Sequence, residues 1–243
     1  MKSVLARTVG PVACELLAAE HLLLESRGGF RRAAPYLLLF FNLFADGYMH
    51  PLMRADPTGH VLALFLFLKS SLIAGLFLLH YLTVSEPILG RIDHLPVSGG
   101  SRFSLVLLGG VRTPGVSGLA ATDLLFLAVI LGEQPVAAAV AIGGLMLLAL
   151  GTIALVCTAA FLLRRSRYPV TALAALGSLG FIALSSSLLV FRSGGLLPLV
   201  PLVWLTQRAV LAALGGSTGL ALGLLGGLGA ASGAILVLGR RLA

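Results

Sequence analysis

Two long stretches of this chain contain no charged side chain, and they limit the folds that are open to it. Residues 135–163 and 169–191 hold no Asp, Glu, Lys or Arg. An α-helix of about 20 apolar residues is long enough to cross the hydrocarbon core of a bilayer, which is roughly 30 Å thick. Charged residues make up only 11% of the sequence, against about 25% in soluble domains. The sequence therefore predicts an all-α polytopic membrane protein, with residues 1–243 as a single transmembrane domain.

Apolar segments divide the chain into six predicted transmembrane helices. A lead-in helix at residues 103–111 precedes the third of them and is broken from it at Pro114. The six predicted spans cover residues 34–53, 59–84, 116–132, 136–162, 169–191 and 217–238.

Two further segments flank these spans. In residues 1–32, apolar residues alternate with Glu15, Glu20 and Glu25, which favours an interfacial amphipathic helix on the cytoplasmic side of the membrane. Residues 193–216 are apolar but contain two prolines, so we interpret them as short outer re-entrant helices before the last span. If this segment instead crossed the membrane, the C-terminus would move to the other side.

The distribution of basic residues predicts that both termini are cytoplasmic. Cytoplasmic loops of membrane proteins carry an excess of Lys and Arg. With six spans and the N-terminus inside, 13 of the 17 basic residues fall on the cytoplasmic side and three fall outside, while Lys69 lies within a span. The inner set is Lys2, Arg7, Arg27, Arg31, Arg32, Arg91, Arg102, Arg112, Arg164, Arg165, Arg167, Arg240 and Arg241; the outer set is Arg54, Arg192 and Arg208.

Three ionisable residues fall inside predicted spans: Asp46, Lys69 and Asp123. Charged groups within a membrane are costly, and they usually face a cavity or a partner. One interpretation is a polar lining of a substrate pathway. The alternative is a structural ion pair, or side chains that extend toward the interface.

A row of small residues marks the last predicted span and the residues just before it. Gly215, Gly219, Gly223 and Gly227 recur every four residues and share one helix face. Such rows allow helices to approach closely in lipid, so we predict close packing here, mostly within the subunit. In a chain with 30 glycines, the spacing also arises by chance.

The residues that could support catalysis or metal binding do not form a known pattern. The only cysteines, Cys14 and Cys157, are far apart, and no H-E-x-x-H motif occurs. Asp46 and His50 are four residues apart, with His60 beyond a short loop, which is a weak metal signal. The serines of residues 185–187 have no nearby base. We therefore predict no metal, no cofactor and no catalytic residue on this chain.

The predicted cytoplasmic loop at residues 85–102 mixes acidic, basic and turn-forming residues. Glu86 and Pro87 suit the first turn of a helix, and Pro96 would stop it. Leu89, Ile92 and Leu95 would form one apolar edge. A short amphipathic helix of this kind is a good contact for a soluble partner, although an ordinary solvated loop fits the pattern equally well.

This loop also carries a resemblance to a known family. The stretch EPILGRIDHLPVSGGSRF resembles the first cytoplasmic loop of type-2 ABC exporter permeases, the transmembrane subunits of ABC transporters. The segment LLPLVPLVWLTQRAVLAALGG is similar to the outer re-entrant helices of that family, with Pro201, Trp204 and Gly215 at matching positions. The basic ending LGRRLA and the N-terminal amphipathic segment also resemble parts of that family.

The resemblance implies a permease subunit in a bacterial plasma (inner) membrane. Two permease subunits, identical or different, would each bind an ABC ATPase subunit. ATP and Mg²⁺ would belong to that ATPase, because this chain has no G-x-x-x-x-G-K-[ST] motif. The resemblance favours export of the substrate. The net charge of +8 reflects the Arg-rich cytoplasmic loops, so we expect no nucleic-acid partner. It assigns ATPase coupling to Glu86, Arg91, Asp93, His94, Leu95, Pro96, Val97 and Ser98.

The sequence departs from the family at Gly99 and Gly100, where the family often has basic residues. That difference leaves two interpretations open: an altered docking surface, or a permease-like subunit that no longer couples to ATP. The alternative function is a non-catalytic integral-membrane subunit that anchors or assembles a larger complex.

Overall fold

The computed structural model describes residues 40, 42–53, 56, 59–92, 97–164 and 200–243, and every regular element in these ranges is a helix. Residues 42–53 are helical and belong to the first predicted span. The predicted amphipathic helix at residues 1–32 and the predicted span at residues 169–191 lie outside the described residues. The prediction of an all-helical fold is confirmed for the described part of the chain.

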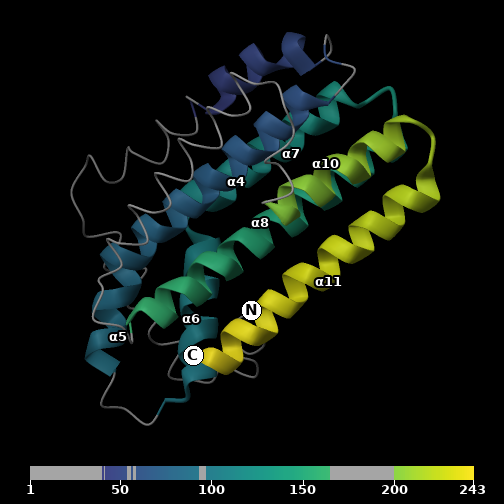
Figure 1. The fold of residues 1–243 in the computed structure, drawn as a ribbon. Coiled ribbons are helices and arrows are strands. Elements are labelled where there is room, and N and C mark those ends of the chain that lie inside the picture. Colours follow the sequence, from purple (N-terminus) through teal and green to yellow (C-terminus); the bar gives the residue numbers. More distant parts are fainter. Residues whose placement is uncertain (1–39, 41, 54–55, 57–58, 93–96, 165–199) are drawn as a thin grey trace, which may run out of the picture.

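Three of the described helices are long and apolar enough to cross a membrane. They are α4 (His60–His80), α8 (Pro135–Arg164) and α11 (Thr218–Leu242), and they correspond to predicted spans two, four and six. In Figure 1 they run side by side along the molecule with α7 and α10. A fourth crossing is formed if the bent pair α6 and α7 counts as one span. These helices support a multi-pass membrane protein.

A bend in the chain precedes the helix that corresponds to the third predicted span. Helix α6 (Gly99–Arg112) and helix α7 (Pro114–Ile130) meet at an angle of 55°. Thr113 has an extended backbone (φ −59°, ψ 134°), because a residue before proline is disfavoured in the helical region. Its hydroxyl donates to the carbonyl of Gly110 (2.7 Å) and closes the end of α6. The break at Pro114 was predicted, but α6 begins earlier than the predicted lead-in.

The second predicted span continues without a loop into the predicted coupling segment. Helix α4 is followed by a single π-helical turn, η1 (Tyr81–Ser85), and then by α5 (Glu86–Ile92). Pro87 has no N–H and crowds the carbonyl four residues before it, so a regular helix is strained there. The wider π turn immediately precedes this position, with the Glu86 N–H donating to the Tyr81 carbonyl. The result is a continuous helical rod over residues 60–92.

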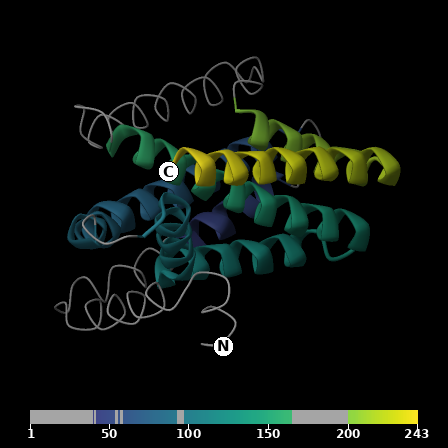
Figure 2. The ribbon, with the colours of Figure 1, turned by 90° about the horizontal axis from the view of Figure 1, so that it is seen from below.

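Helix α10 (Pro201–Leu214) is too short to cross a membrane alone, since its 14 residues extend about 21 Å. It packs against α8 and α11 (Figures 1 and 2), and its assignment as an outer re-entrant helix stays a prediction. The turn to α11 is a Schellman motif in which Gly216 adopts a left-handed φ of 79°. There Ser217 N–H donates to the Ala212 carbonyl (2.8 Å).

The bundle has two distinct ends. At the α5 end lie α5, the start of α6 and the last residues of α8 and α11 (Figure 1). At the α10 end lie the start of α4, the turn between α7 and α8, and the turn between α10 and α11. The α10 end is fixed by Gln207, whose Nε2 donates to the Gly59 carbonyl (2.9 Å). Gly59 has a φ of 74°, and an added Cβ would lie 2.8 Å from a methyl group of Leu211.

Each end has its own hydrophobic core. The core of the α10 end combines α10 with the first halves of α4, α8 and α11. The core of the α5 end combines α5 and α6 with the second halves of α4 and α8. Lys69 lies on α4 between Phe67 of the first core and Ile73 of the second. Asp123 lies on α7 between Leu119 and Leu127 in the same way. Both charged residues therefore lie where the two cores meet.

The closest helix contacts are made by glycines other than the predicted row. A Cβ added at Gly219, Gly223 or Gly227 would meet nothing within 4 Å, and at Gly215 it would meet only carbonyls of its own helix. Close packing by this row remains a prediction, and the described helices do not supply its partner. The glycines that permit close contact with another described helix or its end include Gly99, Gly100, Gly110, Gly144, Gly151 and Gly239.

Candidate functional site

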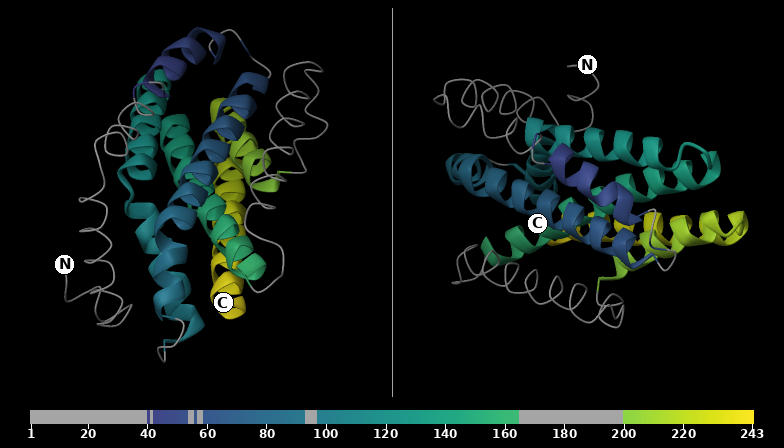
Figure 3. Two further views of the ribbon diagram at one scale, coloured as in Figure 1. Left: turned by 90° about the vertical axis from the view of Figure 1, so that its left-hand side faces the viewer. Right: turned by 90° about the horizontal axis from the view of Figure 1, so that it is seen from above.

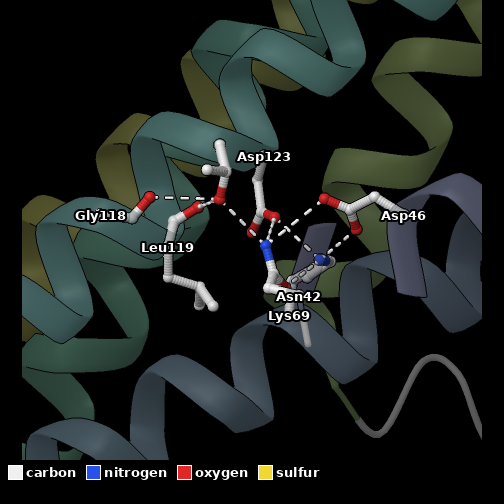
Figure 4. A network of polar contacts seen from close by, with 7 residues as sticks. Asn42, Asp46, Lys69, Gly118, Leu119 and Asp123 are labelled. Carbon is white, nitrogen blue, oxygen red and sulfur yellow. Dashed lines mark hydrogen bonds and ion pairs between the residues drawn. The ribbon is translucent and has the colours of Figure 1, made fainter. Parts of the chain in front are cut away.

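Figure 3 shows how the helical segment 42–53, α4 and α7 are arranged, and a polar cluster lies between them (Figure 4). Lys69 of α4 contributes the ammonium group, and Asp46 and Asp123 contribute a carboxylate each. Asn42 contributes an amide that contacts all three. The structure thus brings together the three ionisable residues predicted to lie in spans.

The helical spacing explains why these side chains converge. Asn42 and Asp46 are four residues apart and share one face of their helix. Lys69 is nine residues after the start of α4, about 14 Å along its axis. Asp123 is seven residues before the end of α7, about 10 Å along its axis. The cluster therefore lies well inside the bundle, at a similar distance from the α10 end on each helix.

Lys69 is the centre of the cluster (Figure 4). Its Nζ donates to Asn42 Oδ1 and Asp46 Oδ1, and it lies 2.8 Å from Asp123 Oδ1. These contacts use all three donors of an ammonium group. Lys69 Nζ also lies 5.1 Å from the ring centre of Phe65, within the range of a cation–π interaction.

Asn42 connects the carboxylates to the α7 backbone. Its Nδ2 lies 2.8 Å from Asp123 Oδ1, 3.0 Å from Thr122 Oγ1 and 3.4 Å from Asp46 Oδ2. The Thr122 hydroxyl in turn lies within hydrogen-bonding distance of the Leu119 carbonyl (2.9 Å). The 3.4 Å contact between Asn42 Nδ2 and Asp46 Oδ2 is long for a hydrogen bond, so Asp46 is held mainly by Lys69.

The cluster is closed off from solvent. Asn42, Asp46, Lys69 and Asp123 are 4%, 2%, 5% and 0% exposed. Three aromatic rings lie toward the α10 end: Phe65 stacks on Phe126 at 5.4 Å between ring centres, and His50 meets Phe126 edge-on at 6.5 Å. Low polarity around a charge pair strengthens its attraction but also raises the cost of any group left unpaired.

Sequence reasoning identified the charges of this cluster but missed its neutral members. Asn42 and Thr122 were not predicted as site residues. The sequence could have indicated Asn42, because Asn42, Asp46 and His50 recur every four residues and therefore share one face of an otherwise apolar helix. Thr122 gave no signal, since threonine within a span usually bonds to its own helix.

Four of the eight predicted coupling residues are described by the structure, and these four lie at the α5 end. Glu86 begins α5 and is half-buried, and Arg91 lies in the last turn of α5. Val97 is half-buried, and Ser98 caps α6 by accepting a hydrogen bond from the Ser101 N–H (3.2 Å). Asp93, His94, Leu95 and Pro96 lie outside the described residues.

Gly99 and Gly100 accommodate the end of α11. A Cβ at Gly99 would lie 2.2 Å from the carbonyl oxygen of Ala243, and a Cβ at Gly100 would lie 3.1 Å from the Arg240 side chain. A larger residue at Gly99 would displace Ala243, and one at Gly100 would crowd Arg240 in the last turn of α11. The two glycines at which the sequence departs from the pattern of ABC permeases are therefore the positions where α6 contacts the end of α11.

No group of three or more His, Cys, Asp or Glu side chains that could hold a metal ion occurs within the described ranges. Comparison with protein-family models, with curated proteins and with solved structures gave no match to this chain.

Proposed function

We propose that this chain is the permease subunit of an ATP-driven ABC transporter and moves a substrate across a bacterial plasma membrane, with export as the favoured direction. A second permease subunit and a separate ATPase chain would complete the complex. The proposal begins from the resemblance of residues 86–103 to the coupling loop of type-2 ABC exporter permeases. The observation that carries it further is the continuous helical rod over residues 60–92.

The rod supplies a mechanical connection between the proposed docking site and the interior. Its α5 end carries Glu86 and leads into the loop where an ATPase would bind. Its middle carries Lys69, which bridges the segment 42–53 and α7. Buried Ile88 and Leu89 hold α5 in the core of the α5 end. A rigid element with packed ends transmits a displacement, whereas a flexible loop absorbs it.

The charge distribution supports a cytoplasmic position for the α5 end. Arg102, Arg164, Arg240 and Arg241 lie at this end, in the first turn of α6 and in the last turns of α8 and α11. Near the α10 end, Asp56 accepts a hydrogen bond from the Val61 N–H of α4, Glu133 lies in the turn after α7, and α10 carries a single basic residue, Arg208. An excess of arginine is typical of the cytoplasmic face. An ATPase that binds the α5 end would then have access to cytoplasmic ATP and Mg²⁺.

The association with an ATPase is tested by purification in a mild detergent. We expect a nucleotide-binding chain to copurify with the wild-type protein and to be lost from the Leu95→Ser variant. Loss of one buried leucine side chain from an interface costs about 1.5–3 kcal/mol, which corresponds to roughly ten- to hundredfold weaker binding. Mass spectrometry of the purified complex measures the amount of each chain.

Glu133→Gln is the matched control, because Glu133 is exposed in the turn at the opposite end of the bundle. This variant should retain the ATPase. Absence of any nucleotide-binding chain from the wild-type complex would contradict the proposal and favour an anchoring or assembly subunit instead.

A further inference from the structure

The buried cluster contains one more negative charge than positive charge. Asp46 and Asp123 face a single ammonium group, that of Lys69. Among the described residues, no other cation forms an ion pair with either carboxylate. Asn42 and Thr122 are neutral. With both carboxylates ionised, the cluster would carry a net charge of −1 at a position that is almost completely closed to solvent.

The two oxygens of Asp123 are in different environments. Oδ1 accepts hydrogen bonds from Lys69 Nζ and Asn42 Nδ2, each at 2.8 Å. Oδ2 is buried and has no hydrogen-bond partner. Both oxygens of Asp46, by contrast, have a partner within the cluster. An ionised carboxylate oxygen without a partner is strongly unfavourable in an apolar interior, so the surplus charge is least tolerable at Asp123 Oδ2.

We propose that the cluster binds one proton, which Asp123 carries on Oδ2. The step forms one O–H bond, consumes one proton delivered from water and involves no oxidation. The neutral carboxyl group keeps Oδ1 free to accept from Lys69 and Asn42, and the remaining charges of Lys69 and Asp46 cancel. This site goes beyond the proposed ATP-driven transport and does not depend on it.

The other ionisable groups near Asp123 agree with this assignment. The helical segment 42–53 contributes Asp46, which is already paired, and His50, which contacts Phe126 one turn farther toward the α10 end. Helix α4 contributes only Lys69 to the cluster. Helix α8, which packs against α7, has no Asp, Glu, Lys or Arg in residues 135–163. Release of the proton would therefore leave an unbalanced charge between α4 and α7, which couples proton binding to the packing of these helices.

Infrared difference spectroscopy of the full chain in lipid nanodiscs tests the proposal. A buried protonated carboxyl group gives a carbonyl band that shifts in D₂O, and its intensity per chain counts the protons held. If the cluster stays neutral, we expect one such band in the wild type at neutral pH and none in Asp123→Asn or Asp46→Asn. Lys69→Met should show about twice the wild-type intensity, because both carboxylates must then be neutral. His50→Gln is the control and should keep the wild-type band.

Asn is close in shape to a neutral Asp, so Asp123→Asn should fold, and size-exclusion chromatography checks this. A wild-type band that persists unchanged in Asp123→Asn would overturn the assignment. Absence of the wild-type band would also overturn it, and an increase in thermal stability on adding Na⁺ or K⁺ would then show that a metal cation balances the charge. If Lys69→Met does not fold, the two aspartate variants still decide the question.

Discussion

Replacing Lys69 by methionine should destabilise the protein by about 3–5 kcal/mol, the usual cost of removing one partner from a buried ion pair. Methionine fills a similar volume, so the loss would come from the charge and not from a cavity. Asp46 and Asp123 would then face each other without a cation in a closed interior. Thermal unfolding of the purified chain in nanodiscs, followed by circular dichroism or light scattering, measures the loss.

Removing all three charges provides the control. The triple variant Lys69→Met, Asp46→Asn, Asp123→Asn should recover most of the stability, since well-packed neutral residues often replace a buried ion pair without loss. Acidic pH should also partly restore Lys69→Met, because the folded variant would bind protons that the unfolded chain releases. Equal melting temperatures for Lys69→Met and the wild type would contradict the central position of Lys69.

Replacing Gly110 by alanine should cost about 1–3 kcal/mol, as overpacking of a dense core does. The new Cβ would lie 2.1 Å from the ring of Phe77, which is 0% exposed in the core of the α5 end. The buried ring must shift to make room for the methyl group, which disturbs its packing in the core of the α5 end. Thermal unfolding measures the effect, and the double variant Gly110→Ala, Phe77→Leu should recover part of it.

Gly223→Ala is the matched control for this helix contact. Gly223 lies on α11, and a Cβ there would meet nothing within 4 Å. Alanine is the better helix former by up to about 1 kcal/mol, so this variant should be as stable as the wild type or more stable. Equal destabilisation by both substitutions would show that the α4–α6 contact is not closely packed.

The apolar pattern predicted the long helices well, because in lipid every backbone polar group must be satisfied within the segment. Helices α8 and α11 begin within one residue of their predicted starts, at Pro135 and Thr218. The bend at Pro114 was also predicted, since proline restricts the residue before it. The length of α6 was not, because Gly99 and Gly100 are poor helix formers and their helical state depends on the Ser98 cap.

The polar cluster depends on contacts between side chains of different helices, which could not be predicted from the sequence. Asp46, Lys69 and Asp123 were recognisable as charges in spans, but their depths gave no proof of contact. Their pairing depends on how the segment 42–53 lies against α4 and α7, which is a tertiary property. The close contacts between the described helices involve glycines outside the predicted row, and close packing by the row itself stays a prediction. Spacing identifies a face of a helix, but packing decides which face is covered, and Gly110 and Gly239 belong to no such row.

The proposed coupling of an ATPase to the α5 end is tested most directly by site-specific photocrosslinking. Gly90 lies on the exposed side of α5 with nothing within 4 Å of an added Cβ, so a photoreactive side chain there would leave the fold intact. Glu133, in the turn at the opposite end, provides the comparison position. In intact membranes, we predict a covalent adduct between position 90 and a nucleotide-binding chain, and none from position 133. An adduct with that chain from position 133, or no nucleotide-binding chain captured from position 90, would contradict the proposed function.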